Sequence, residues 1–283
     1  MVKRMEKKRQ HGLTVYNAGD PQSSFRDHST AKEVLRQKGY PSYLLSRSAK
    51  TEKSRKLGVN TKVMYLVPGL FCPAASPGCL RSCLGHSSGR LAGSQAADAR
   101  DKRSALYLAE RELFMHVLYA EIAQHGLESR QQGLQAAVRL NGSSDIPWEE
   151  RHPELFRMFP EVQFYDYTKL APRMMAFLQR SQDDSTWPSN YHLTYSLSET
   201  NSGSAEKVLE AGGNVAAVFW PRVPSRWRGV EVIDGDASDA RHRDPSPRYV
   251  GLSAKGVAKR ELGGFVVRAD TQKNGSATRV FAA

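Results

Sequence analysis

Residues 191–220 read YHLTYSLSETNSGSAEKVLEAGGNVAAVFW and hold two apolar segments on either side of a helical one. We predict strands at 191–198 and 214–220, and a helix at 204–213 that stops at its glycine pair. Two short apolar strands joined by a helix form a βαβ unit, in which the strands run parallel. This stretch therefore predicts a parallel sheet covered by helices.

The same alternation continues on both sides of this unit. Further strands are predicted at 64–70, 136–142, 162–168, 230–236, 248–256 and 264–269, and helices at 94–125, 147–159 and 170–181. A short helix followed by a turn is predicted at 34–45. Six to eight short parallel strands favour an α/β fold with a partial or full parallel β/α barrel, TIM-like in form. A doubly wound open sheet is the main alternative.

Charge and the pattern of apolar residues divide the chain into three parts. The formal net charge is +12, and basic residues are dense in the first 62 positions. We predict a basic N-terminal arm, flexible or loosely docked, over 1–56, a barrel domain over 57–270 and a tail over 271–283. A basic surface indicates nucleic acid, a nucleotide or another polyanion as partner, although a soluble protein with a basic tail has the same composition.

The sequence also predicts a location inside the cell. It has no run of about 18 apolar residues, so we expect no membrane contact. The basic N-terminus lacks the apolar segment of a secretory signal. We therefore expect a cytoplasmic protein, and the sequence does not indicate its oligomeric state.

All three cysteines lie in one Pro- and Gly-rich loop. Cys72, Cys79 and Cys83 follow the predicted strand 64–70 with the spacing C-x6-C-x3-C. An odd number of thiols in a reducing compartment makes a disulfide framework a poor explanation. Confinement to such a loop differs from the usual place of cysteine in a core.

Four interpretations of this loop remain open. Three thiolates can hold a 4Fe-4S cluster and leave its fourth iron free for a ligand. His86 follows Cys83 by three residues, so a tetrahedral zinc site with three Cys and one His is an alternative. A catalytic thiol, or three inert loop cysteines, are the other two.

Polar residues follow most predicted strands, at the edge where β/α barrels carry their chemistry. Ordinary loop composition is the competing explanation. We select Asp166, Lys169, Glu199 and Asp234 as candidates for catalysis or proton transfer. A set of small polar residues is predicted to bind a cofactor or ligand: Gly142, Asp145, Ser196 and Ser198.

Several of these motifs resemble those of a known family. They are a KLGVNTKV lead-in, the CPAASPGC-x3-C loop, VRLNGSSD, FYDYTK, HLTYSLSE, a late DGD-x2-DAR and VGLSAKG. In this order they are similar to the phage gene product 88 family over roughly residues 57–260. The resemblance implies a phage protein acting in an infected bacterial host, and it assigns no reaction.

A more distant resemblance is to the radical S-adenosylmethionine (SAM) enzymes, at the level of architecture. It implies that Cys72, Cys79 and Cys83 ligate a 4Fe-4S cluster and that the four small polar residues above contact SAM. Those enzymes usually have C-x3-C-x2-C, so this loop is longer, and no Gly-Gly-Glu follows the second strand. We expect a radical SAM-like iron–sulfur enzyme acting on a nucleotide, nucleic acid or other small anionic substrate. The alternative is a non-catalytic, zinc-stabilised protein that binds nucleic acid or a host partner.

Overall fold

The computed structural model describes residues 9–10, 13–14, 28–87, 89–180 and 186–269. The helices are α2 (His28–Gln37), α3 (Ala49–Lys53), α4 (Pro77–Arg81), α5 (Leu84–Ser87), α6 (Ser94–Ala109), α7 (Arg111–Gln131), α8 (Trp148–Arg151), α9 (Pro153–Met158), α10 (Ala171–Leu178) and α11 (Ser202–Glu210). Short 3-10 helices are η1 (Ser54–Leu57), η2 (Gly89–Ala92), η3 (Arg241–Arg243) and η4 (Gly256–Arg260). The strands are β1 (Arg9–Gln10), β2 (Leu13–Thr14), β3 (Leu45–Ser46), β4 (Val59–Met64), β5 (Gln135–Arg139), β6 (Gln163–Thr168), β7 (Tyr191–Ser196), β8 (Val215–Trp220), β9 (Arg226–Trp227), β10 (Val230–Asp234), β11 (Tyr249–Ser253) and β12 (Val266–Arg268).

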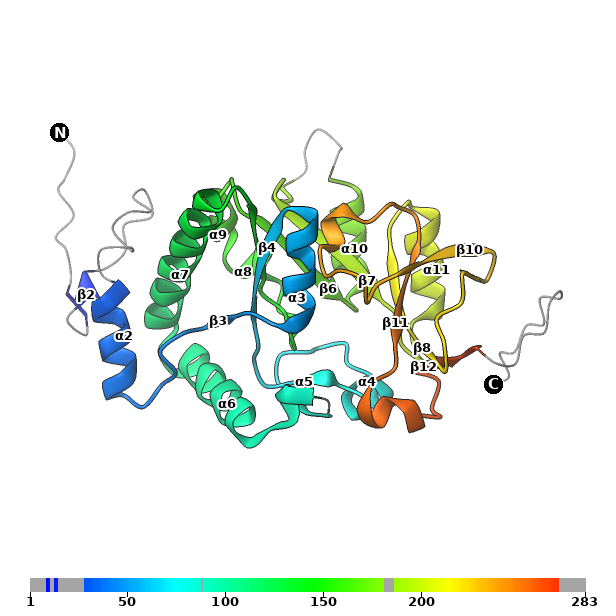
Figure 1. Ribbon diagram of the computed structural model, residues 1–283, viewed down its shortest axis with the longest axis horizontal. Helices are drawn as coiled ribbons and strands as arrows, with labels where there is room; N and C mark the ends of the chain where they lie inside the picture. The colour runs from blue at the N-terminus through cyan, green and yellow to red at the C-terminus, as the bar shows by residue number, and fades with distance from the viewer. Residues whose placement is uncertain (1–8, 11–12, 15–27, 88, 181–185, 270–283) are drawn as a thin grey trace.

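One mixed sheet organises the described chain. Its parallel strands lie in the order β4, β5, β6, β7, β8, β11 and β10, and β12 pairs with the end of β8 (Figure 1). At the edges β3 runs antiparallel to β4, and β9 runs antiparallel to β10. The α/β fold with parallel strands is therefore confirmed. The described sheet of ten strands is open, so it lacks the closure that a full barrel requires.

Several predicted elements need correction. The helix predicted within 34–45 is α2, which ends at Gln37 before Gly39 (φ +73°), and Leu45 already belongs to β3. The predicted helix 147–159 is divided at His152 into α8 and α9, because His152, with φ −143° and ψ 56°, is not helical.

The first central strand is β4 and ends at Met64, whereas the prediction placed it at 64–70. Beyond Met64 the backbone leaves the sheet: the Val67 amide donates to Ser104 Oγ, and Gly69 has a φ of +86°. The predicted helix 94–125 is two helices, because Glu110, with φ −135° and ψ 59°, is not helical. The Glu110 carboxylate pairs there with Lys38.

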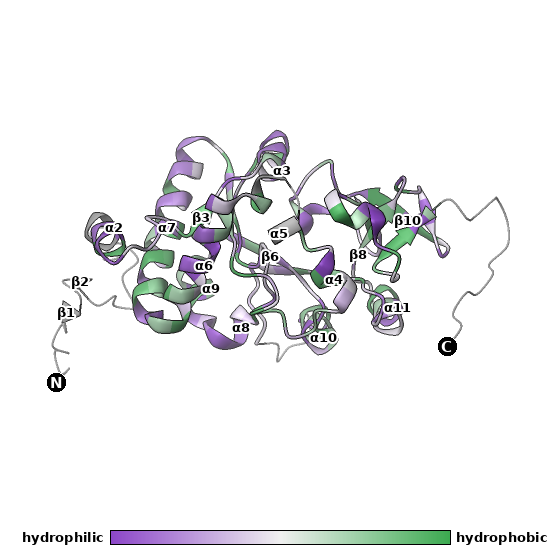
Figure 2. Cartoon of the chain, turned by 90° about the horizontal axis from the view of Figure 1, so that it is seen from below, coloured by the Kyte–Doolittle hydropathy of each residue, from purple (hydrophilic) through white to green (hydrophobic). Residues whose placement is uncertain are grey.

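The sheet has two different faces. On the helix face, α7 packs on β5, α10 on β6 and β7, and α11 on β7 and β8. Figure 2 shows α7, α8, α10 and α11 following one another along this side, with α3 opposite. On the other side, here called the loop face, α3 packs on β4, and η3 contacts β6 and β7.

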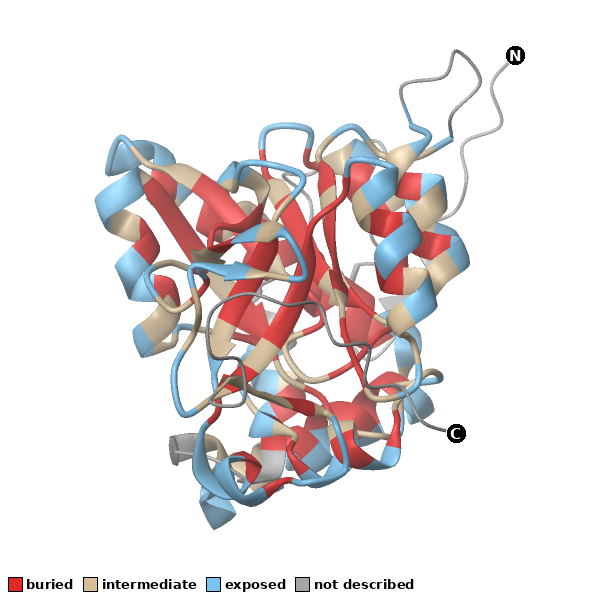
Figure 3. Cartoon of the chain, turned by 90° about the vertical axis from the view of Figure 1, so that its right-hand side faces the viewer, coloured by how far each residue is buried: buried red, intermediate tan, exposed pale blue. Residues whose placement is uncertain are grey.

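Strand periodicity assigns side chains to these faces. Val138, Phe164 and Leu193 belong to the main core beneath the helices. The neighbouring residues Ala137 and Tyr165 pack instead on the loop face, in a small cluster with Val59 and Ala240. Figure 3 shows that the strands are buried while the helices expose their outer sides. Both faces of the central strands are therefore covered, as parallel sheets require.

Part of the predicted arm packs on the domain. Leu35 of α2 and Leu44, beside β3, are fully buried in the main core, and α2 contacts α7. Apart from β1 and β2, the first 27 residues lie outside the described residues, as does the predicted tail. The division at residue 57 stays a prediction. No helix in the described ranges is long and apolar enough to cross a bilayer.

Candidate functional site

The cysteine loop lies at the carboxyl ends of the parallel strands. It connects β4 with α6 and contains α4 and α5, which Figure 1 shows just beyond those ends. Cys79 lies in α4, Cys72 precedes this helix, and Cys83 lies between α4 and α5. None of the three cysteines forms a disulfide, and all are half-buried. The predicted position of the loop, beyond the end of a parallel strand, is therefore confirmed.

Local sequence explains the conformation of α4. Ser76 precedes the helix, and its Oγ accepts a hydrogen bond of 3.2 Å from the Cys79 amide. Pro77 occupies the first turn, where its missing N–H costs nothing. A Ser cap followed by Pro is a strong helix start, and it fixes Cys79 as the third residue of a five-residue helix.

Glu199 fastens this helix to the sheet. Its carboxylate accepts hydrogen bonds of 2.6 Å from Ser76 Oγ and 2.6 Å from the Gly78 amide. Burial acts to raise the Glu199 pKa, but these bonds outweigh it and the pKa is lowered. A Cβ on Gly78 would lie 2.7 Å from Glu199 Oε1 and 2.7 Å from Phe265 Cβ, so glycine is required there. Glu199 therefore positions the cysteine loop against the end of β7.

The three thiols lie in one electrostatic environment. Burial is the main cause that raises the pKa of Cys72 to about 11, and the neighbouring Asp145 and the other two thiols contribute in the same direction. Cys72 Sγ lies 3.7 Å from the Ser143 carbonyl oxygen. Burial also raises the pKa of Cys83, with Lys169 and Arg100 acting in the opposite direction. Without a bound cation these two thiols are protonated at neutral pH.

Lys169 and Ser196 lie beside the cysteine loop. Lys169 follows β6, Ser196 ends β7, and Lys169 Nζ donates a hydrogen bond of 2.7 Å to Ser196 Oγ. The ammonium also lies 5.7 Å from the centre of the Phe265 ring, next to β12. The structure thus brings together Lys169, Ser196, Glu199 and the three cysteines from the predicted set.

Asp145 supports this region without facing solvent. Its carboxylate accepts bonds from Thr168 Oγ1 (3.2 Å), the Lys169 amide (2.8 Å) and an Arg173 guanidinium nitrogen (2.9 Å). Arg173 also binds Glu149 at 2.6 Å. Asp145 is 7% exposed, so its position fits a role in holding the loops after β5 and β6 together.

Two other predicted ligand residues are engaged in local structure. At Gly142 a Cβ would lie 2.5 Å from the Met64 carbonyl oxygen, so this glycine allows close packing against the end of β4. The Ser198 amide donates to Asn201 Oδ1 at 2.7 Å, and Ser198 Oγ lies 3.3 Å from Thr200 Oγ1. Both contacts shape loops at the carboxyl edge of the sheet.

Asp166 and Asp234 lie apart from the cysteine loop. Asp166 is fully buried on the helix face, where it accepts bonds from the Asn141 amide (2.7 Å) and Tyr191 Oη (2.8 Å). Burial raises its pKa to about 7. Asp234 ends β10, which β11 separates from β8, and its carboxylate accepts from the Asp236 amide at 2.8 Å.

The metal-binding interpretations need a rearranged loop. Over the described ranges, no three His, Cys, Asp or Glu side chains are gathered closely enough to hold a metal ion. The side chain of His86, the alternative zinc ligand, lies outside the described part of the chain. The donor chemistry of three neighbouring thiols fits a soft metal centre, but their described positions do not yet form one.

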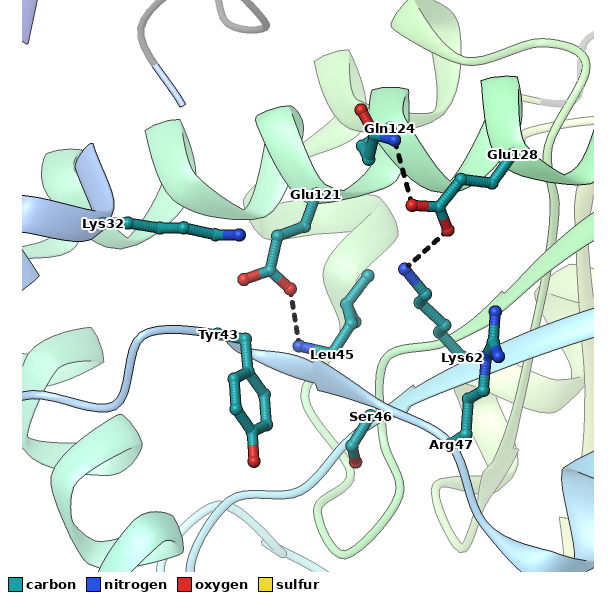
Figure 4. A pocket seen from close by; sticks show the side chains of 9 residues that line it. All are labelled: Lys32, Tyr43, Leu45, Ser46, Arg47, Lys62, Glu121, Gln124 and Glu128. Atoms are coloured by element: carbon teal, nitrogen blue, oxygen red, sulfur yellow. Dashed lines mark hydrogen bonds and ion pairs between the residues drawn. The ribbon is translucent and has the colours of Figure 1, made fainter. Parts of the chain in front are cut away.

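A cavity of about 500 Å³ lies elsewhere, between α7 and the edge strand β3 (Figure 4). Three of its charged residues, Glu121, Lys62 and Glu128, are already paired with each other or with the backbone. Glu121 accepts bonds of 2.8 Å from the Leu44 and Leu45 amides, and Lys62 pairs with Glu128 at 3.4 Å. The contacts of Glu121 hold the edge strand β3 in place. The cavity is therefore a weaker candidate site than the cysteine loop.

Sequence reasoning missed several residues that shape the site. Ser76 and Arg173 were not selected, although they anchor α4 and Asp145. Nor were Arg139, Tyr167 and Thr194, which lie on the loop face. A signal for Thr194 is present in HLTYS, where every second residue is polar.

The fold and site together define a class: an α/β protein with an open, mainly parallel sheet and a three-thiol loop at the carboxyl edge of its parallel strands. The model of the Gene product 88 family matches residues 36–274. The match covers most of the chain, which therefore belongs to this family of phage proteins. No curated protein and no solved structure matches the chain significantly. The predicted family is thus confirmed, and the comparisons lend no support to the radical SAM likeness.

Proposed function

We propose that this Gene product 88 family member is a phage-encoded metal-binding protein in which Cys72, Cys79 and Cys83 ligate a 4Fe-4S cluster. One observation carries the proposal. Every cysteine of the chain lies in one loop at the carboxyl edge of the parallel strands, and Cys72 is close enough to the other two thiols to interact with both electrostatically. Three thiolates satisfy three irons of a cubane cluster and leave the fourth iron open.

Loading this site requires the loop to move. The anchors Ser76 and Glu199 hold the start of α4, whereas the contacts of Cys72 are to the backbone of Gly69, Ala75 and Ser143. We infer that Cys72 and Cys83 close toward Cys79 when metal binds. Deprotonation of the thiols accompanies ligation, so affinity rises with pH.

The enzyme that we propose is radical SAM-like. When bound, the cluster would supply one-electron reduction of SAM held at its open iron. Lys169 and Ser196 would contact the ligand or substrate, because they lie at the same edge as the thiols. Glu199 would position the loop. A small anionic substrate such as a nucleotide, or a nucleic acid, fits the chain's net charge of +12.

A zinc site is the second candidate, favoured by the place of His86. Cys83 lies directly before α5, and His86 is the third residue of that helix. Two intervening residues are a common spacing between neighbouring ligands of a structural zinc site. Cys72, Cys79, Cys83 and His86 would then form a structural zinc centre in a protein that binds nucleic acid or a host partner without catalysis.

Anaerobic purification followed by iron, zinc and sulfide analysis separates the two candidates. We expect a brown protein with about four irons and four sulfides per chain, and loss of iron on Cys→Ala at each cysteine. His86→Ala should keep its iron. Leu84→Ala, an exposed neighbour, is the matched control and should load normally. One zinc per chain without sulfide, lost on His86→Ala, would refute the cluster and support the zinc site.

A further inference from the structure

The loop face holds a group of buried polar side chains that the cysteine site does not use. Arg139 ends β5, while Tyr167 and Thr194 are direct neighbours on the parallel strands β6 and β7. Arg139 lies over the Tyr167 ring, with 4.6 Å between the guanidinium carbon and the ring centre. The three side chains therefore converge on one area of this face.

Polar atoms in this group lack partners. Within the described part of the chain, Arg139 Nε, Tyr167 Oη and Thr194 Oγ1 are buried without a hydrogen bond. Thr194 is fully buried, and the Arg139 side chain is 16% exposed. An unsatisfied buried donor costs about 1–3 kcal/mol, so three together indicate an absent partner.

The local charge favours an anion as that partner. Arg241 of η3 is 1% exposed, is an electrostatic neighbour of Tyr167, and also has an unpartnered Nε among the described atoms. Two carboxylates oppose these cations. Asp239 is shared between Lys50 and Arg139, and Asp244 pairs with Arg241 at 2.9 Å. Three cations against two carboxylates leave a positive surplus.

We propose that the loop face binds the phosphoryl group of a small-molecule substrate through Arg139, Arg241, Tyr167 and Thr194. Guanidinium N–H and hydroxyl O–H groups can donate hydrogen bonds to phosphate oxygens, and the paired N–H groups of a guanidinium match two of those oxygens. The anion site stands independently of the metal. Its part in a reaction rests on the proposed function.

The proposed phosphate site lies on the same two strands that lead to Lys169 and Ser196 beside the cysteine loop. Lys169 follows Tyr167 by two residues, and Ser196 follows Thr194 by two. Two residues of a strand span about 6.6 Å, so a phosphate held at Tyr167 leaves the rest of its molecule to extend toward Lys169 and the thiols. A substrate of mononucleotide size fits this separation.

Calorimetric titration of the full chain with inorganic phosphate, at constant ionic strength set with chloride, tests the site. We expect binding, weakened at least about tenfold by Tyr167→Phe and by Thr194→Val, each of which removes one hydroxyl that donates to a charged ligand. Tyr165→Phe is the matched control. Its hydroxyl lies on the same strand and face but already donates to Asp239 (3.2 Å), so phosphate affinity should stay within about twofold.

Three results would overturn the inference. The first is the absence of phosphate binding, which would mean that water is the partner of the unpartnered atoms. The second is an equal loss of phosphate affinity in Tyr165→Phe and Tyr167→Phe. The third is tighter binding of acetate than of phosphate. Circular dichroism confirms that each variant is folded. Repeating the titration with all three cysteines changed to alanine separates the two proposals, since phosphate should bind without metal.

Discussion

At the residue scale, Asp166 illustrates how one position along a strand decides what a carboxylate does. It was selected as a catalytic candidate because it belongs to the polar end of FYDYTK. Strand alternation directs its side chain to the helix face, where Asn141 and Tyr191 donate to it. These bonds and Arg173 favour the charged carboxylate, but burial is the stronger influence and raises the pKa to about 7.

This pKa predicts a pH-dependent contribution to stability. Because the folded pKa lies above the ordinary 3.8, the contribution of Asp166 is full below about pH 4 and is lost as pH rises to 7. The free energy of unfolding of the wild type, minus that of Asp166→Asn, should fall by about 1.4 kcal/mol per pH unit in this window. Urea unfolding at several pH values measures it. A flat difference, or a carbon-13 titration of Asp166 near pH 4, would contradict the prediction.

At the scale of elements, α4 is stable only through its contacts. A helix of five residues is too short to persist alone, so its N-terminal hydrogen bonds decide whether Cys79 is shielded. Ser76 provides one of these bonds, and Glu199 binds both Ser76 and the Gly78 amide. The carboxylate also interacts favourably with the positive end of the helix.

Removing this anchor should expose Cys79. In the metal-free protein, Glu199→Ala is expected to speed Cys79 labelling by a thiol reagent about 5- to 30-fold, which corresponds to a lost cap of about 1–2 kcal/mol. Mass spectrometry assigns the rate to each cysteine. Glu206→Ala, which removes an exposed carboxylate on α11, should leave the rate unchanged. Equal rates in wild type and Glu199→Ala would show that Glu199 does not hold the loop.

At the scale of the whole molecule, Asp239 connects segments distant in the chain. It is 1% exposed and pairs with Lys50 of α3 at 3.3 Å and with Arg139 of β5 at 3.5 Å. Its oxygen also accepts from Tyr165 Oη, and its amide donates to Ser54 Oγ. Burial acts to raise its pKa, but the cations prevail and lower it. On the loop face, the buried carboxylate of Asp239 therefore holds α3 and β5 to the segment before η3.

Breaking this pair should destabilise the entire fold. Asp239→Ala is expected to cost about 3–5 kcal/mol, because it leaves Lys50 and Arg139 without their acceptor. Urea unfolding followed by circular dichroism and by tryptophan fluorescence measures the loss. Asp98→Ala removes an exposed pair with Lys102 and should cost less than about 1 kcal/mol. Similar losses in the two variants would exclude a structural role for Asp239.

The sequence predicted the parts of this molecule that depend on local pattern. Apolar strands such as 214–220 and the glycine pair after α11 indicated the parallel sheet and its carboxyl edge. Local patterns could not predict whether the sheet closes into a barrel, because closure depends on whether the edge strands β3 and β9 pair with each other. The partners of Glu199 and Asp239 were also hidden, since Ser76 and Lys50 are more than 100 residues away and single-sequence patterns carry no information on pairing at that distance.

The two edges of the open sheet have a consequence for behaviour at high concentration. An exposed strand edge can recruit a second chain by hydrogen bonding and start aggregation. Here each edge strand has only two residues and runs against the direction of its neighbour. Such short antiparallel edge strands expose few backbone groups for hydrogen bonding. The sheet can therefore remain open without adding strands from a second chain.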